Sequence, residues 1–227
     1  MSDEIQYGTL NLPDGKEIKY LVNGLKYFGF KSIDPFFDER LFKYFEEMNS
    51  KLEYLKVKPG DIMIDVGASV GSWSIYAAIY GCKVYAFEVG QPQLKTLDFN
   101  ARFNDLRDLI IIYDCALDSS DDTSLTFDEL MGLKKSDKAE VSSLSFDTWV
   151  NQHRDELPRI DYMKIDVEGM EFEVLRGAYH TLKEFRPKLI IEIHDVGNPI
   201  LRHDIENFLK DLGYNHKHIP GLNDYFF

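Results

Sequence analysis

The sequence predicts an α/β protein with an open, doubly wound sheet whose strands are mostly parallel. Between residues 61 and 212, short runs of β-branched and aromatic residues alternate with segments of helical periodicity. Strands that alternate with helices in this way are joined by right-handed crossovers and therefore lie parallel. With 227 residues, 44% of them hydrophobic, the chain can bury a sizeable core. We expect one domain with some elaboration.

Residues 1–58 precede this alternation and predict an N-terminal extension to a domain that covers residues 59–227. The turn residues Pro13-Asp14-Gly15 predict a hairpin near the start. Segment 36–54 is rich in aromatic residues and predicts a helix that belongs to the core or to a lid. The apolar residues on one side of that helix are Phe37, Leu41, Phe45, Met48 and Leu52.

Apolar runs predict the strands of the sheet, and periodic segments predict the helices between them. The expected strands are residues 61–66, 82–87, 109–113, 160–165 and 188–193. A helix of small residues should follow Gly71 and continue through Tyr80. The next helix carries Leu94, Leu97 and Ala101 on one face, and a single helix between the last two strands carries Phe172, Leu175, Ala178, Leu182 and Phe185.

The end of the chain departs from the alternation. Asn198 and Pro199 suit the start of a final helix, which should end before Gly213. Residues 214–219 and 224–227 flank a Pro-Gly turn and predict an antiparallel hairpin. Residues 117–150 also lie outside the rhythm: they are polar and end in a short strand-like stretch around 142–146.

Composition excludes several classes of protein. The chain has 26 Lys and Arg against 39 Asp and Glu, and a net charge of -13 disfavours nucleic acid and anionic membranes as partners. No apolar run is long enough to span a membrane, and the start lacks the features of a signal peptide. Cys82 and Cys115 are too few and too far apart for a disulfide framework or a zinc site. We expect a soluble, reduced, cytoplasmic protein.

The segment Asp65-Val66-Gly67-Ala68-Ser69-Val70-Gly71 lies where a strand turns into a helix, a position where glycines let the backbone approach a ligand. A nicotinamide dinucleotide fits poorly, because Ser69 replaces the middle glycine of its usual fingerprint and Asp65 would repel a pyrophosphate. A cofactor without phosphate and with a positive charge fits better, and S-adenosylmethionine (SAM) is such a molecule. Glu88, at the end of the next strand, can accept hydrogen bonds from ribose hydroxyls in either cofactor.

Three sequence blocks resemble class I SAM-dependent methyltransferases, and more narrowly the FkbM family. They are residues 60–71 (GDIMIDVGASVG), residues 84–88 (VYAFE) and residues 160–178 (IDYMKIDVEGMEFEVLRGA), the last being the most specific. The resemblance implies a Rossmann-like sheet of seven strands with an antiparallel last strand, and an N-terminal extension that covers the acceptor pocket. Family members commonly have Pro after the ribose-binding acid, whereas this chain has Val89-Gly90.

Ligands of open α/β sheets bind outside the carboxyl ends of the strands. The resemblance places the adenine near Asp114, Cys115 and Ala116, the ribose at Glu88 and Val89, and the methionine end at Asp65, Gly67, Ala68, Ser69 and Gly71, with Asp166 also at the cofactor. Cys115 would then be a small packing residue and not a nucleophile.

Methyl transfer to a hydroxyl requires a base, and the predicted rim offers Asp166, Glu168 and His194 as catalytic residues. Each has a structural alternative: Asp166 could hold a loop, His194 could be hydrogen-bonded in place, and Glu168, like Glu171, could complement a helix N-terminus. The three groups could also hold a divalent metal, as in catechol-type enzymes, but no second acidic pair supports this and we assign no metal ligand.

The favoured function is SAM-dependent O-methylation of a hydroxyl on a sugar, a glycan or another small metabolite. Three alternatives remain open: an RNA ribose methyltransferase, a SAM-binding module without catalysis, and an NAD-dependent oxidoreductase. The sequence does not identify the acceptor or the oligomeric state.

Overall fold

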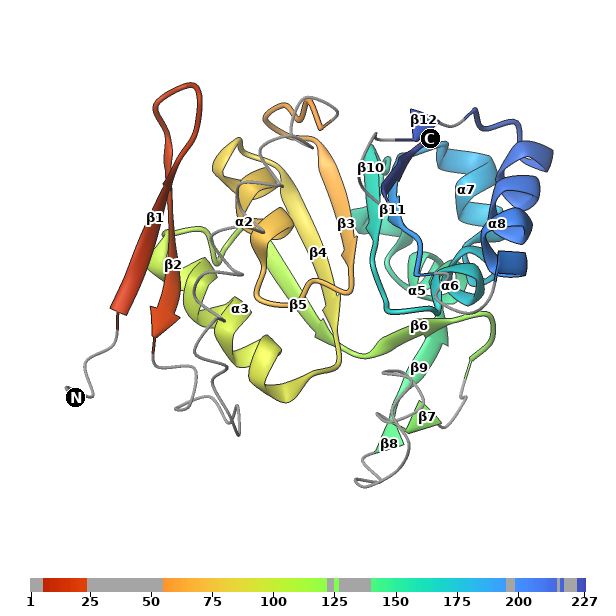
Figure 1. Cartoon of the computed structure of the whole chain (residues 1–227), viewed down its shortest axis with the longest axis horizontal. Helices are drawn as coiled ribbons and strands as arrows, with labels where there is room; N and C mark the ends of the chain where they lie inside the picture. Colours follow the sequence, from red (N-terminus) through yellow and green to blue (C-terminus); the bar gives the residue numbers. More distant parts are fainter. Residues whose placement is uncertain are drawn as a thin grey trace. The chain divides into compact units, whose positions relative to one another are not determined.

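The computed structural model describes residues 6–23, 55–121, 125–126, 140–194, 199–215, 217–218 and 224–227. The chain forms two compact units, the first made of residues 1–61 and 68–113 and the second of residues 62–67 and 114–227. The division falls inside the predicted glycine loop, between Gly67 and Ala68. Each unit is described by itself below, with the element labels of Figure 1.

The first unit combines a β-hairpin with a strand-and-helix layer. Its elements are β1 (Gln6–Asn11), β2 (Glu17–Asn23), α2 (Ser72–Ile79), β4 (Lys83–Glu88), α3 (Gln91–Phe103) and β5 (Ile110–Asp114). β1 and β2 pair antiparallel around the predicted turn, which confirms the hairpin. β4 is the hydrogen-bonded neighbour of β5, and its Val84 to Phe87 are fully buried. The predicted strands and helices of this unit are therefore present within the described residues, which do not include the helix predicted over residues 36–54.

Helix α3 holds the hairpin through two asparagines one turn apart. Asn100 accepts a hydrogen bond from the backbone N–H of Leu21 at 3.0 Å and donates one to the carbonyl of Val70, also at 3.0 Å. Asn104 accepts from the N–H of Lys19 at 2.8 Å and donates to its carbonyl at 2.6 Å. Four residues of a helix rise about 6 Å and two residues of a strand about 6.8 Å, so the two asparagines match alternate residues of β2.

The second unit contains the parallel strands of the sheet. β3 (Ile62–Val66), β10 (Tyr162–Ile165) and β11 (Lys188–Glu192) pair parallel in the order β3-β10-β11, and β13 (Asp224–Phe226) then pairs antiparallel with β11. β12 (Lys217–His218) pairs antiparallel with β13 and completes the predicted C-terminal hairpin. The α/β class with mostly parallel strands is confirmed, whereas the count of seven strands and the domain boundary at residue 58 stay predictions.

Helices of the second unit gather beside β10 and β11 (Figure 1). They are α5 (Phe146–Gln152), α6 (Glu171–Gly177), α7 (Tyr179–Phe185) and α8 (Pro199–Asp211), with a 3₁₀ turn η2 (Arg154–Glu156). The short strands β6 (Ala116–Asp118) and β9 (Ser143–Ser145) pair parallel, and β7 (Leu125–Thr126) pairs antiparallel with β8 (Glu140–Val141). The polar segment thus contains the expected short strand, and the sequence analysis missed α5, which is capped by the Ser145 side chain.

One predicted helix is in fact two. The helix expected across residues 172–185 breaks at Ala178, between α6 and α7. At Gly177 the backbone packs so closely on the carbonyl of Asp118 that a Cβ would overlap it. The carboxylate of Asp147 then caps the new helix by accepting from the N–H groups of His180 and Thr181 at 2.9 and 2.7 Å.

Three predicted features lie outside the described residues: the aromatic helix of residues 36–54, the residue Asn198 before α8, and the turn at residues 220–221. Among the described helices, none is both long and apolar enough to cross a membrane.

Candidate active site

The first half of the glycine loop is held by a lysine from the neighbouring strand. Lys164 of β10 is in register with Asp65 of β3, and its Nζ donates to the carbonyl of Gly67 at 2.6 Å. Gly67 has a positive φ of 73°, and a Cβ there would overlap the carbonyl oxygen of Asp166. This position therefore requires glycine, both for the backbone conformation and for the close approach of the next strand.

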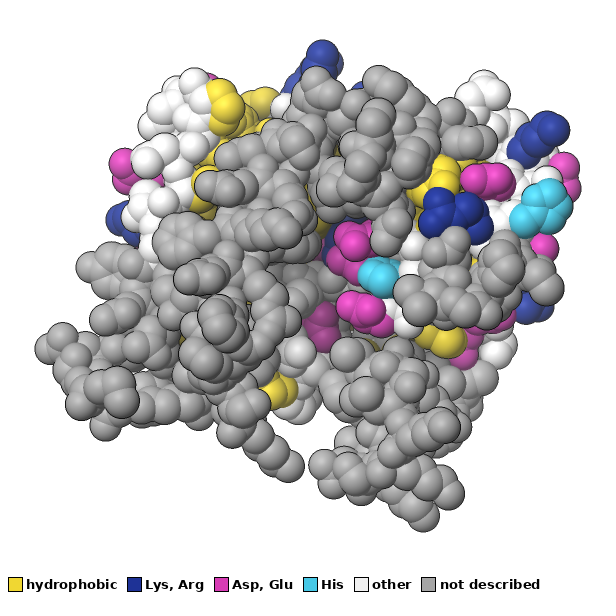
Figure 2. All heavy atoms as spheres, viewed as in Figure 1, with side chains coloured by type: hydrophobic (Ala, Val, Ile, Leu, Met, Phe, Trp, Pro, Cys, Tyr) yellow, Lys and Arg dark blue, Asp and Glu magenta, His cyan; other side chains and the backbone are white. Residues whose placement is uncertain are grey.

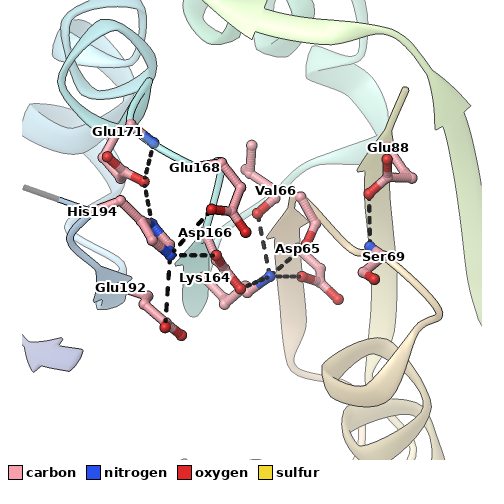
Figure 3. A network of polar contacts seen from close by, with 12 residues as sticks. Asp65, Val66, Ser69, Glu88, Lys164, Asp166, Glu168, Glu171, Glu192 and His194 are labelled. Atoms are coloured by element: carbon pink, nitrogen blue, oxygen red, sulfur yellow. Dashed lines mark hydrogen bonds and ion pairs between the residues drawn. The ribbon is translucent and has the colours of Figure 1, made fainter. Parts of the chain in front are cut away.

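Lys164 is nearly buried and lies between two carboxylates. Its Nζ is 3.4 Å from Asp65 Oδ1 and 3.5 Å from Asp166 Oδ2, and the Asp65 side chain is fully buried (Figure 3). A buried charge is tolerated only when it is paired and hydrogen-bonded, and this lysine satisfies both conditions. Lys164 therefore ties the predicted cofactor acid, the loop carbonyl and Asp166 into one network.

The second half of the loop lies in the first unit and is held by Glu88. The N–H of Ser69 donates to Glu88 Oε2 at 2.8 Å (Figure 3). The N–H groups of Val89 and Gly90 donate to Oε1 at 2.9 and 2.7 Å. Three amides thus fix the orientation of the carboxylate. Because each carboxylate oxygen can accept about two hydrogen bonds, Oε2 keeps capacity for a further donor.

The loop ends at a second required glycine. Gly71 has a positive φ of 92° and forms the N-cap of α2, where a Cβ would overlap the side chain of Leu97. The N-cap residue Gly71 has no side chain to cap this helix, so the start of α2 presents backbone N–H groups. Ala68, just before Ser69, is buried and donates its N–H to the carbonyl of Phe87 at 3.0 Å.

The second unit gathers four carboxylates around one imidazole. His194, which follows β11, has Nδ1 2.9 Å from Glu171 Oε1. Its Nε2 lies 3.6 Å from Glu168 Oε2, 3.7 Å from Glu192 Oε1 and 3.9 Å from Asp166 Oδ1 (Figure 3). Since a carboxylate can only accept, the Nδ1 proton bridges to Glu171. In the space-filling view a histidine is visible at the surface beside acidic side chains (Figure 2).

This environment changes the acidity of the imidazole. The hydrogen bond that His194 donates to Glu171 raises the pKa of His194 to about 9, and the charges of Asp166 and Glu168 add to the effect while burial opposes it. Because the raised pKa favours the protonated imidazole near neutral pH, His194 can accept a proton only from its neutral form.

The loop between β10 and α6 aims these acids. Glu168 adopts a positive φ of 53°, which is uncommon for a residue with a side chain, and Gly169 follows with 108°. The N–H of Gly169 donates to Glu171 Oε1 at 2.9 Å. Glu171 is fully buried, and within the described part of the chain its Oε2 has no hydrogen-bond partner. Glu171 thus sits in the first turn of α6, as the sequence suggested, but it also holds the histidine.

The segment predicted at the adenine has no nucleophile. Asp114 is exposed, Cys115 is partly buried, and Ala116 is buried with its N–H donated to the carbonyl of Ser142. Burial, together with the charge of Asp114, raises the pKa of Cys115 to about 11. A thiol of that pKa stays protonated near neutral pH and reacts slowly, in agreement with a packing role.

Comparison with known proteins identifies the family. A family model described as the methyltransferase FkbM domain matches residues 65–215. The chain belongs to the FkbM methyltransferase family. SAM is the cofactor of this family. The match begins at Asp65 and contains His194 and the three acids near its Nε2, which are Asp166, Glu168 and Glu192.

Solved structures share the FkbM fold at low sequence identity. The FkbM methyltransferase of Methylobacillus flagellatus KT superposes with a TM-score of 0.55 at 18% identity, over 89% of this chain and 58% of that one. The fibrillarin pre-rRNA processing protein of Methanococcus jannaschii gives a TM-score of 0.51 at 13% identity, over 98% of this chain and 81% of that one. At these identities the likeness shows the fold. This FkbM chain spans just over half the length of the Methylobacillus protein.

The structure brings the three predicted catalytic residues together, because Asp166, Glu168 and His194 each place one donor atom within 4.8 Å of the others. Sequence reasoning missed two members of the network, Lys164 and Glu192. The signal for Lys164 was present, since a lysine in an otherwise apolar strand must find a buried acid. Glu192 had no such signal, because it lies at the end of its strand.

Proposed function

We propose that this FkbM chain is a SAM-dependent O-methyltransferase that acts on a hydroxyl of a sugar, a glycan or another small metabolite. The observation that carries the proposal is the FkbM match, which includes both the glycine loop from Asp65 and the acid–histidine cluster. The glycine loop supplies contacts to the cofactor. The acid–histidine cluster supplies groups that can remove the proton of an acceptor hydroxyl, which a SAM-binding module without catalysis would not need.

The proposed contacts to SAM come from residues at or just after the ends of successive strands. Glu88 accepts from the ribose hydroxyls through the remaining capacity of Oε2, and Val89 lies beside it. Gly67 to Gly71 face the methionine end, where Asp65 and Asp166 favour its positive charge. Asp114, Cys115 and Ala116 border the adenine.

The reaction is an in-line displacement. The acceptor oxygen forms a bond to the methyl carbon as the carbon–sulfur bond breaks, and the electron pair of that bond stays on sulfur, which becomes the neutral thioether of S-adenosylhomocysteine. The hydroxyl proton passes to one of the proposed catalytic groups, Asp166, Glu168 or His194, and then to water. Because their donor atoms lie within 4.8 Å of one another, one bound hydroxyl can reach all three.

The test is the formation of S-adenosylhomocysteine from SAM by the purified chain with panels of sugars, glycans, hydroxylated metabolites and RNA. We expect turnover with a member of the first three panels. Asp166→Asn and His194→Ala should each lower that turnover at least tenfold. His194→Ala should largely keep the SAM affinity, whereas Asp166→Asn removes a charge proposed at the methionine end and should also weaken SAM binding. His203→Gln, a change of an exposed histidine on α8, should leave turnover unchanged.

Turnover with RNA alone would show that the acceptor is RNA and not a sugar, glycan or small metabolite. Wild-type turnover in both Asp166→Asn and His194→Ala would refute the assignment of these residues as catalytic. SAM binding without turnover on any panel would favour a binding module.

A further inference from the structure

We propose that Asp166, Glu168 and His194 form a binding site for one divalent metal ion of the Mn²⁺ class. Each residue would supply one ligand atom: Asp166 Oδ1, Glu168 Oε2 and His194 Nε2. All three lie in the second unit, at the ends of β10 and β11.

The spacing of the donor atoms suits a single ion. His194 Nε2 is 3.6 Å from Glu168 Oε2 and 3.9 Å from Asp166 Oδ1, and each of the three residues places one ligand atom within 4.8 Å of those of the other two. Ligands bound at about 2.1 Å are separated by about 3 Å when adjacent and about 4.2 Å when opposite. Changes of up to about 1 Å in these separations would therefore bring the three atoms to coordination distance of one ion. The side chain of His194 is 22% exposed, that of Glu168 57% and that of Asp166 20%, so an ion can reach them from solvent.

A second observation, independent of the spacing, is the buried carboxylate behind the histidine. Glu171 is 0% exposed, its Oε1 lies 2.9 Å from His194 Nδ1, and its Oε2 has no hydrogen-bond partner among the residues that the structure describes. Histidines that bind metals through one ring nitrogen commonly donate the other N–H to a carboxylate, which fixes the ring and makes it a stronger ligand. The same contact here directs Nε2 toward Asp166 and Glu168.

The local charge also favours a cation. Nε2 faces Asp166, Glu168 and Glu192, and Nδ1 faces Glu171, so four carboxylates meet at one imidazole. Lys164 offsets charge on the far side of Asp166, where its Nζ approaches Oδ2 and leaves Oδ1 directed at the histidine. A divalent ion at Nε2 would bring a positive charge to the point where the carboxylates converge.

The donor set limits the type of ion. Carboxylate oxygens suit Mg²⁺, Ca²⁺ and Mn²⁺, whereas imidazole suits later first-row metals, so one imidazole with two carboxylates fits Mn²⁺ best among these. Three protein ligands leave positions open for other ligands. If the proposed function holds, on which this last step rests, an acceptor hydroxyl bound there would lose its proton more easily.

The test is a titration of the EDTA-treated, dialysed full chain with Mn²⁺, followed by the electron paramagnetic resonance signal of the free ion. We expect one saturable site in the wild type. Glu168→Gln and Asp166→Asn should each weaken binding at least tenfold, and Glu171→Gln, which leaves the ligands in place, should weaken it about 10- to 100-fold. Glu173→Gln is the matched control on the same helix, because Glu173 pairs with Arg176, and it should leave binding unchanged.

The proposal is overturned if the wild type binds Mn²⁺ no more tightly than the Glu168 and Asp166 variants, since binding would then be to dispersed surface acids. Circular dichroism of each variant separates loss of the site from loss of the fold. Calorimetry with SAM in EDTA tests the proposed function independently: Mn²⁺ binding without SAM binding refutes that function alone, and SAM binding without a Mn²⁺ site refutes the metal alone.

Discussion

Asn100 is the residue whose removal tests the account of the first unit most sharply. It is 2% exposed and makes two hydrogen bonds to backbone groups, one to Leu21 in the hairpin and one to Val70 in the glycine loop. Asn100→Leu keeps the branching at Cγ but leaves a buried N–H and a buried carbonyl without a partner. Each unsatisfied group costs about 1–3 kcal/mol, so with two such groups the free energy of unfolding should fall by roughly 2–6 kcal/mol.

The matched control is Asn104→Leu, four residues along the same helix face. Asn104 also makes two hydrogen bonds to β2, but at the exposed backbone of Lys19, where water can replace the amide. Its loss should cost about 1 kcal/mol or less. Urea unfolding followed by circular dichroism measures both variants. Equal losses for Asn100→Leu and Asn104→Leu would refute the argument that burial of the hydrogen bonds sets their contribution.

Two further predictions concern the glycine loop and the adenine segment. Gly67→Ala should lower the free energy of unfolding by more than about 2 kcal/mol, because its Cβ would overlap the carbonyl of Asp166. Gly60→Ala is the control: Gly60 also has a positive φ, but no described atom lies within 4 Å of the new Cβ, so the loss should be only about 1–2 kcal/mol. Thermal or urea unfolding measures both variants, and similar losses would contradict the role of the close contact at Gly67. Cys115, with its pKa raised to about 11, should be alkylated by iodoacetamide at a rate that rises about tenfold per pH unit from pH 7 to 10. The fully buried Cys82 should stay unmodified, and peptide mass spectrometry measures both cysteines. A plateau of the Cys115 rate near pH 9 would refute the raised pKa.

The fold was largely readable from the sequence because hydrophobic periodicity reports burial directly. The apolar runs before Gly67 and Glu88 became β3 and β4, and the hairpin at Pro13-Asp14-Gly15 formed where turn chemistry placed it. The break at Ala178 was not readable. It depends on the backbone of Asp118, which is distant in sequence and close only in the folded chain.

The site was predicted as a set of acids but not as a network. The pairing of Lys164 with Asp65 depends on the register of strands about 100 residues apart, which no local pattern contains. The sequence indicated that Glu171 complements a helix N-terminus, because it lies just after Gly169 in the first turn of the predicted helix. Its contact with His194 depends on the turn at Gly169, whose N–H donates to the Glu171 carboxylate. Asn100 carried no signal, since a polar residue on a helix is usually solvated.

The central claim is that this FkbM chain uses SAM, and calorimetric titration of the purified chain with SAM tests it most directly. We predict saturable binding of one SAM per chain, weakened about 10- to 100-fold by Glu88→Ala, because ribose hydroxyls lose a charged acceptor. Glu156→Ala, a change at an exposed acid in η2, should leave the affinity unchanged. Absence of binding at millimolar SAM, or equal affinity in the wild type and Glu88→Ala, would contradict the account.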